Sequence, residues 1–356
     1  MSIFDEMLKS DETLFRDAVA LDYDFIPKLI PYREKEQKHI ALCIKPLFQR
    51  RTGKNIMVYG APGIGKTVAV KHIFKELEEK TDEIIPIYVN CWQKNTSFKI
   101  AMEICEILDY RFTHNKKTDE LFKVISTILN KKSAVFCFDE IDKAEEQDFL
   151  YTLLEEIYRK TIILITNYKT WVLELEDRLK SRLMLEFLEF KEYSPEETKG
   201  ILRERLRYAF VDGVWEDDGF NLAARKTAEL KDIRAGLYLL REAGNAAEDK
   251  ASKKITLEHV KTALNKLSDF NIKKSTELKE DERFILSIVK KNSGKKSGEL
   301  YEIFKKNGGQ GVYRTFQRKI DFLAKSKFIS VTKTLGGPEG TTSIIKYERD
   351  AKLSDY

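Results

Sequence analysis

The sequence contains few residues of the kinds that build disulfides, zinc sites or membrane spans. Among 356 residues there are 4 Cys and 4 His, and neither type shows the paired spacing of a zinc site. We therefore expect reduced cysteines that pack in the core. No apolar run reaches the roughly 20 residues that span a bilayer, and the amino terminus lacks the basic and apolar segments of a signal peptide. These absences predict a cytoplasmic protein with no membrane partner.

Charge is unevenly distributed along the chain. The net charge is +5, yet the segment Phe284–Lys333 alone holds 12 Lys/Arg and 3 Asp/Glu. The rest of the chain has 51 basic and 55 acidic residues. A mildly acidic body with a basic C-terminal part indicates binding to nucleic acid or another polyanion, although a solvated lysine-rich surface would have the same composition.

A glycine-rich loop predicts a phosphate-binding site. It follows an apolar, strand-like run at 55–59 and precedes a helix-like run that starts at Val68. In this context the pattern G-x-x-x-x-G-K-[ST] holds the phosphates of ATP or ADP through backbone amides and the positive end of the helix. Lys66 would reach the β- and γ-phosphates, and Thr67 would bind Mg²⁺. The residues expected to hold the nucleotide here are Gly60, Ala61, Pro62, Gly63, Ile64, Gly65, Lys66, Thr67 and Val68.

Polar residues follow two further strand-like runs. The run 134–138 ends in Asp139 and Glu140, and the run 161–166 is followed by Asn167. After a phosphate loop, Asp139 is typical of a Mg²⁺ ligand, and Glu140 is typical of the residue that polarises the attacking water. Asn167 would point toward the γ-phosphate or this water, although a simple turn residue is the alternative. We predict no metal site beyond Mg²⁺.

The order of elements predicts three domains. Alternating strands and helices favour a parallel α/β sheet with its ligand at the carboxyl ends of the strands. A single amphipathic helix is expected from about Glu34 to Arg50, a half-buried strand at 185–190, a helical region from Ser194 to about 267, and a linker at Lys273–Thr276. The predicted domains are an α/β P-loop ATPase core at 1–191, a helical lid at 192–275 and a third domain at 276–356.

Three helix-like segments and a glycine-rich hairpin predict that the third domain is a winged helix. Its third helix, at 313–325, has apolar residues on one face and basic or polar residues on the other. This composition favours a helix that enters the major groove of DNA, while a winged helix that contacts protein is the alternative. The predicted DNA-binding residues are Arg314, Gln317, Arg318, Lys325, Lys333 and Lys346.

The whole pattern resembles the archaeal origin-recognition and cell-division-control type replication initiators, which are AAA+ ATPases. Besides the phosphate loop, the resemblance rests on five stretches. These are Leu21–Pro27, Ile30–Glu34, Tyr88–Cys91, Phe138–Asp142 and the lid stretch Asp232–Gly244. The resemblance covers nearly all of the chain and implies an AAA+ core, a helical lid and a winged helix.

The resemblance also implies roles for single residues. Asn167 matches the sensor-one position, and Arg234 matches the sensor-two arginine that contacts the γ-phosphate. Arg178 matches the box-seven arginine of the family, whereas Arg182 resembles the arginine finger of clamp loaders, so either would act in trans. The residues implied to meet the nucleotide from outside the loop are Arg33, Tyr193, Arg205 and Arg234.

Together these patterns predict an ATP-dependent replication initiator that associates with the nucleoid. It would bind duplex DNA at a replication origin, with slow ATP hydrolysis as a switch. Self-association on DNA and loading of the replicative helicase are further expectations from the resemblance. Two alternatives stay open. One is a signalling or defence ATPase whose winged helix contacts protein, and the other is a transposition-helper ATPase that binds DNA without sequence preference.

Overall fold

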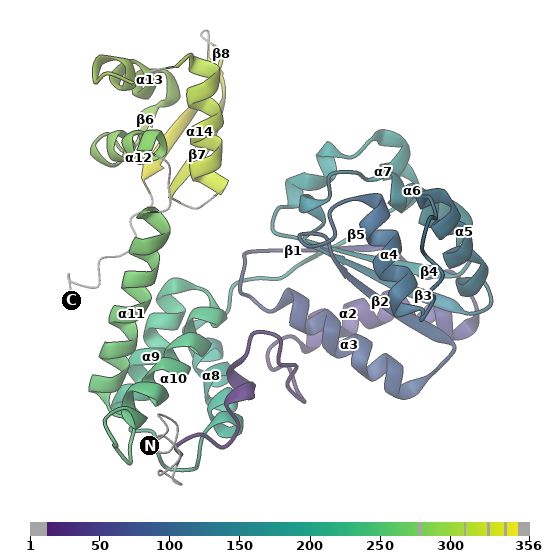
Figure 1. Ribbon diagram of the computed structural model, residues 1–356, viewed down its shortest axis with the longest axis horizontal. Helices are drawn as coiled ribbons and strands as arrows, with labels where there is room; N and C mark the ends of the chain where they lie inside the picture. Colours follow the sequence, from purple (N-terminus) through teal and green to yellow (C-terminus); the bar gives the residue numbers. More distant parts are fainter. Residues whose placement is uncertain (1–12, 277–279, 310, 326–327, 338–339, 348–356) are drawn as a thin grey trace. The chain divides into compact units, whose positions relative to one another are not determined.

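The computed structural model describes residues 13–276, 280–309, 311–325, 328–337 and 340–347. Within these ranges, the side chains of residues 268–276, 280, 283, 325, 333–337 and 340–342 are not described. The chain divides into two compact units, Met1–Thr262 and Ala263–Tyr356, whose elements are labelled in Figure 1. The domain boundaries at 191 and 275 stay predictions. None of the described helices combines the length and the apolar character needed to cross a bilayer.

A parallel sheet of five strands forms the centre of the first unit, in the order β2-β3-β4-β1-β5. Strands β3 and β4 are buried along their whole length because helices cover both faces of the sheet. Edge strand β5 alternates between half-buried and exposed residues, as its sequence predicts. The strands are β1 Ile56–Tyr59, β2 Ile84–Asn90, β3 Ser133–Asp139, β4 Lys160–Thr166 and β5 Glu186–Glu189.

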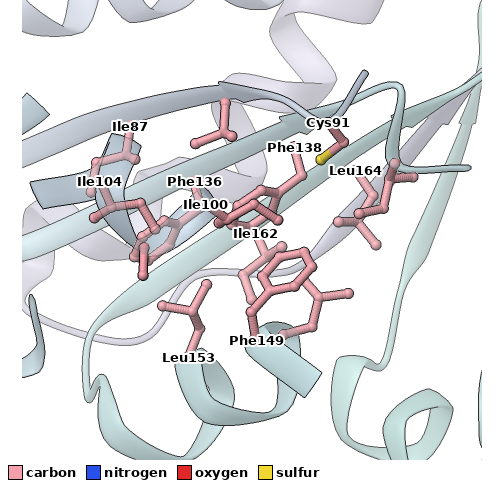
Figure 2. Packing of buried hydrophobic residues seen from close by; sticks show 14 of the residues in the cluster. Ile87, Cys91, Ile100, Ile104, Phe136, Phe138, Phe149, Leu153, Ile162 and Leu164 are labelled. Atoms are coloured by element: carbon pink, nitrogen blue, oxygen red, sulfur yellow. The ribbon is translucent and has the colours of Figure 1, made fainter. Parts of the chain in front are cut away.

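Two hydrophobic cores lie on opposite faces of this sheet. Helices α4 (Ser97–Ile107), α5 (Thr118–Leu129) and α6 (Asp148–Glu156) pack on one face, and α2 (Glu34–Ile44) and α3 (Lys66–Lys80) pack on the other. In the first core, the ring centroid of Phe138 lies 6.0 Å from that of Phe136 and 4.9 Å from that of Phe149 (Figure 2). These contacts hold the carboxyl end of β3 in place.

Two expectations about helix ends are wrong. The helix expected from Glu34 to Arg50 is two elements, because α2 ends at Ile44 and a 3₁₀-helix, η2 (Lys45–Gln49), follows. Pro46 has no N–H, and its ring would clash with the preceding turn of an α-helix. The linker expected at Lys273–Thr276 is the last turn of α11 (Leu257–Thr276). These residues include no Gly or Pro that would end a helix.

The lid consists of α8 (Pro195–Ala209), α9 (Asp217–Leu230), α10 (Ile233–Glu248) and the start of α11. The N-terminal segment that precedes the sheet contacts this lid, although the two are far apart in sequence. Phe15 forms a β-bridge with Phe210, and their ring centroids are 4.7 Å apart. The short 3₁₀-helix η1 (Ala18–Leu21) continues this contact along α8. The N-terminal segment of the first unit therefore packs against its lid.

The second unit has the predicted winged-helix layout. Helices α12 (Glu280–Lys291), α13 (Ser297–Lys306) and α14 (Tyr313–Lys325) pack on an antiparallel sheet with the order β6-β8-β7. The strands are β6 Lys295–Lys296, β7 Ile329–Gly337 and β8 Gly340–Tyr347. Phe316, Ile320 and Leu323 form the inner face of α14, as their spacing predicts. The predicted fold class is confirmed for both units.

Replacement of Phe136 by Ala should destabilise the first unit, because it leaves a cavity beside Phe138 in the core. The expected loss in free energy of unfolding is about 3–5 kcal/mol, which calorimetry would detect as a lower melting temperature. Phe112→Ala is the control, because the side chain of Phe112 is 79% exposed. Equal melting temperatures for the two variants would contradict the role of Phe136.

Candidate functional site

The phosphate loop lies between β1 and α3, as its sequence predicts. Two of its glycines are required by the local geometry. Gly60 has φ +150°, and a Cβ there would lie 2.3 Å from the carbonyl oxygen of Phe190. Gly63 has φ +75°, and its Cβ would lie 2.0 Å from Oδ1 of Asp232. A side chain at either position would push the loop away from its neighbours.

Lys66 lies at the start of α3 with its ammonium group among oxygen atoms. Its Nζ donates to the carbonyl oxygens of Gly60 and Ala61 at 2.8 Å and to Oδ1 of Asn167 at 3.0 Å. Burial lowers the pKa of Lys66 to about 8. The structure thus brings together two residues, Lys66 and Asn167, that lie 101 positions apart in sequence. They meet because β1 and β4 are neighbours in the sheet.

Asp139 is the junction of this site. Its Oδ2 accepts a hydrogen bond from Oγ1 of Thr67 at 2.6 Å, and its Oδ1 accepts one from the backbone N–H of Glu140 at 2.8 Å. Hydroxyl and carboxylate oxygens are the ligands that Mg²⁺ prefers. The donor set of Thr67 and Asp139 therefore fits the predicted metal.

Tyr88 begins one of the stretches that carry the resemblance, but no sequence pattern assigned it a role at the site. Its hydroxyl donates to Oδ2 of Asp139 at 2.8 Å from the neighbouring strand β2, and Nζ of Lys71 lies 4.7 Å from the centre of its ring. Burial, followed by the charge of Asp139, raises the pKa of Tyr88 well above its usual value, so the hydroxyl stays a proton donor. A tyrosine in an apolar strand is typical of a core residue, so its sequence carried no sign of this role.

Glu140 follows Asp139 in the left-handed region, with φ +53°. This uncommon conformation for a residue with a side chain often occurs at active sites. Burial raises the pKa of the Glu140 carboxyl, with smaller contributions from the charges of Asp139 and Asp142. A raised pKa makes the carboxylate a stronger proton acceptor, which is the property that a base for an attacking water needs.

A cavity of about 430 Å³ joins the loop, the acids and the lid. This volume lies within the usual range of small-molecule sites. Its apolar wall comes from the segment 23–32 and from the lid residue Leu237. The predicted site residues that line the cavity are Pro62, Gly63, Gly65, Lys66, Thr67, Val68, Asp139, Glu140, Asn167, Tyr193, Arg205 and Arg234.

Arg234 reaches the cavity from the first turn of α10. Its Nε and Nη2 donate to the two carboxylate oxygens of Asp232 at 3.1 and 2.9 Å. The backbone N–H of Ile233 also donates to the carbonyl oxygen of Gly63 at 3.2 Å. The lid therefore touches the phosphate loop directly, with Arg234 and Asp232 at the point of contact.

Arg205 and Tyr193 line the cavity and also bind other parts of the protein. Nη1 and Nη2 of Arg205 each donate at 3.2 Å, to the carbonyl oxygens of Ala20 and Phe25. Burial lowers the pKa of Arg205 to about 10. The hydroxyl of Tyr193 would lie 2.9 Å from a Cβ at Gly65. Arg205 thus attaches the N-terminal segment to the lid, and Tyr193 packs on the phosphate loop.

Arg33 does not line the cavity but lies behind the phosphate loop. It is 3% exposed, and its guanidinium donates to Tyr193, to Glu36, and to the carbonyl oxygens of Ile64 and Lys191. It also stacks on the ring of Tyr193, with Cζ 3.9 Å from the ring centre. Through these contacts, Arg33 holds the phosphate loop and the start of the lid together. A direct contact of Arg33 with nucleotide stays a prediction that its position does not favour.

Arg178 and Arg182 lie on the surface of α7 (Asp177–Leu183), outside the cavity. Both guanidinium groups lie over the ring of Tyr151, with Cζ 4.3 and 5.0 Å from its centre. Arg178 also hydrogen-bonds the hydroxyl of Tyr151, and Arg182 pairs with Glu155. Both arginines are exposed, and the fold does not distinguish between them as a residue that acts in trans.

The outer face of α14 is exposed and mostly polar, with Phe322 as an exposed apolar residue on it. Phe316 and Ile320 point inward, so the residues between them point away from the core. Lys319, in contrast, is paired with Asp281 at 2.7 Å. The predicted contact residues on the surface are Arg314, Gln317 and Arg318 of α14 and Lys346 of β8. The side chains of Lys325 and Lys333 lie outside the described ones.

The phosphate loop, the acids at the end of β3 and the helical lid together define the class of AAA+ ATPases. A family model described as an AAA domain matches residues 49–167. The model of the Cdc6 AAA+ ATPase-type lid domain matches residues 199–265.

Relatives along the whole chain narrow this class to one family. ORC1-type DNA replication protein 1 of Archaeoglobus fulgidus is 30% identical over 99% of this chain and 92% of its own length. ORC1-type DNA replication protein 1 of Sulfurisphaera tokodaii is 33% identical over 89% of this chain and 85% of its own. The solved structure of the Aeropyrum pernix ORC1 protein in complex with DNA has a TM-score of 0.73 and 26% identity, and it covers 96% of this chain and 95% of its own. The chain belongs to the family of ORC1-type DNA replication proteins, which confirms the resemblance noted from its motifs.

Replacement of Tyr88 by Phe should weaken Mg²⁺ binding without unfolding the protein, because only the hydroxyl that orients Asp139 is lost. Loss of a hydrogen bond to a metal ligand costs about 10–100-fold in metal affinity. The Mg²⁺ dependence of ATP binding, measured by calorimetry, checks this expectation. Tyr158→Phe, on an exposed side chain, is the control. If Tyr88→Phe has the same Mg²⁺ dependence as the control, then Tyr88 does not position the metal ligand.

Proposed function

We propose that this chain is a replication initiator that binds ATP with Mg²⁺ in its cavity and duplex origin DNA through its C-terminal unit. The observation that carries the proposal is the combination, in one chain, of a lid-covered cavity and an exposed basic helix α14. Membership in the ORC1-type family favours this function over the signalling and transposition alternatives. The Aeropyrum relative was solved in complex with DNA, which supports DNA as the partner.

Residues on three sides of the cavity would hold the nucleotide. Lys66 and the loop amides would bind the phosphates, and Thr67 with Asp139 would hold the metal. When bound, Mg²⁺ would neutralise charge on the β- and γ-phosphates. Arg234 is already positioned by Asp232 at the edge of the loop, so a nucleotide with a γ-phosphate would compete with Asp232 for its guanidinium.

Hydrolysis would depend on Glu140 and be slow in a single subunit. Glu140 would take a proton from the attacking water, and Asn167 would orient that water. Neither Arg178 nor Arg182 lines the cavity, and both are exposed on α7, where a neighbouring subunit could approach them. Their position supports self-association as the way to complete the site, because an arginine finger stabilises the charge of the transition state. Loading of the replicative helicase is proposed from the family resemblance alone.

Glu140→Gln should keep ATP binding and lose turnover, because Asp139 remains a metal ligand while the base is gone. The rate should fall by about 10²–10⁴-fold, measured as phosphate release at saturating ATP. In the wild type, turnover should also decrease as the pH is lowered toward the raised pKa of Glu140, because protonation of the carboxylate removes the base. Wild-type turnover in the variant would rule out this role for Glu140.

Alanine substitutions on the outer face of α14 and on β8 should separate sequence discrimination from overall affinity for DNA. Arg314 and Arg318 share this face, and one of them should contact guanine edges. Its replacement by Ala should cost about 1–3 kcal/mol of discrimination between origin repeats and scrambled duplexes. Lys346→Ala should instead weaken binding to both duplexes equally and lower the salt slope by about one unit. Fluorescence anisotropy with the full chain at several salt concentrations measures both quantities.

Lys75→Ala is the matched control for these variants, because Lys75 is an exposed lysine of α3 in the first unit. It should change neither discrimination nor the salt slope. If the α14 and β8 variants also leave both quantities unchanged, the basic face of the second unit is not the DNA contact. A protein-docking role for the winged helix would then be favoured.

A further inference from the structure

A cluster of side chains whose types can bind metal ions lies away from the nucleotide cavity. Among the described residues, His39, Cys43 and Glu186 have ligand atoms that all lie within 4.8 Å of one another. Nε2 of His39 is 2.9 Å and Sγ of Cys43 is 3.6 Å from Oε2 of Glu186. One nitrogen, one sulfur and one carboxylate oxygen thus lie close enough together to bind a single ion.

This cluster lies at the N-terminal ends of the strands, whereas the phosphate loop lies at their carboxyl ends. All strands of the sheet are parallel, and Asp139 is the last residue of β3, whereas Glu186 is the first residue of β5. The two sites therefore share no residue. His39 and Cys43 are four positions apart on α2, so they project from the same face of that helix.

The backbone around the three donors is well anchored. The N–H of Glu186 donates to the carbonyl oxygen of Asn55 at 2.9 Å, in register with β1. The carbonyl oxygen of Cys43 accepts from the N–H of Lys54 at 3.0 Å and from Oγ1 of Thr161 at 3.3 Å. Ligands on a helix and a strand that are held in this way need little rearrangement to bind an ion.

The carboxylate of Glu186 is also oriented by its other oxygen. Nζ of Lys54 donates to Oε1 at 2.7 Å, which leaves Oε2 toward His39 and Cys43. Such outer hydrogen bonds are typical of carboxylates that bind metals.

We propose that His39, Cys43 and Glu186 bind one late first-row divalent cation of the Zn²⁺ class, with a water molecule as the fourth ligand. A thiolate and an imidazole select such ions over Mg²⁺ and Ca²⁺, which prefer oxygen ligands. The ion would link helix α2 to edge strand β5 and so stabilise the N-terminal end of the sheet. Sequence spacing did not suggest this site, because Glu186 lies 143 positions after Cys43.

Cobalt titration of the full chain tests this site. The chain should carry no histidine tag, be treated with a chelator, be kept reduced without thiols, and be assayed in excess Mg²⁺. We expect a sulfur-to-cobalt charge-transfer band in the near ultraviolet at one Co²⁺ per chain, which Zn²⁺ displaces. This band distinguishes the cluster from the oxygen ligands of the nucleotide site, which give no sulfur band. Bound Zn²⁺ should also raise the melting temperature.

Cys43→Ser should abolish the charge-transfer band, and Glu186→Gln should weaken Co²⁺ binding by at least about tenfold. Cys105→Ala is the control, since Cys105 is a buried cysteine of α4 on the other face of the sheet. Circular dichroism should confirm that each variant is folded. A wild-type chain without the band, or an equal band in Cys43→Ser, would overturn the proposal. The cluster would then be a hydrogen-bonded network between Lys54, Glu186 and His39.

Discussion

The nucleotide site depends on the hydrogen bonds that converge on Asp139. Thr67, Tyr88 and the N–H of Glu140 all donate to its carboxylate, from α3, from β2 and from the residue that follows β3. These groups meet because parallel strands end at one edge of the sheet. The rings of Phe136 and Phe138 on β3 pack with the ring of Phe149 from α6 (Figure 2). The position of the metal ligand is therefore set by the packing of the core as well as by its own contacts.

The lid joins this centre through two arginines with different tasks. Arg33 is buried and donates to the phosphate loop, to Tyr193 and to the carbonyl oxygen of Lys191 after β5, so it connects the core to the lid. Among the described residues, the guanidinium of Arg234 hydrogen-bonds to Asp232, on the lid itself. A buried arginine with four partners is costly to move, whereas an arginine with one carboxylate partner can exchange it for a phosphate. This contrast suits Arg33 to a structural role and Arg234 to a response to nucleotide.

The sequence predicted those parts of the fold and site that depend on neighbouring residues. The glycine loop, the acids after β3 and the periodicity of α14 are local patterns, and the structure has each of them where it was expected. Sequence reasoning failed at Pro46, where a helical pattern continued past a residue that cannot extend the helix. It also failed at Lys273–Thr276, where polar residues indicated a linker but nothing in them ends a helix. The role of Tyr88 was missed because it depends on a carboxylate in another strand.

Residue types and their local spacing set the chemistry available to this protein: the loop that binds phosphate, the acids, the basic helix and the family to which they belong. Which of these groups meet depends on the three-dimensional fold. It placed Arg33 behind the loop rather than in the cavity, and Arg178 and Arg182 on an exposed helix. It also brought His39 and Cys43 to Glu186. The reason is that strand order and helix packing set the distances between residues far apart in the chain, and no local pattern contains those distances.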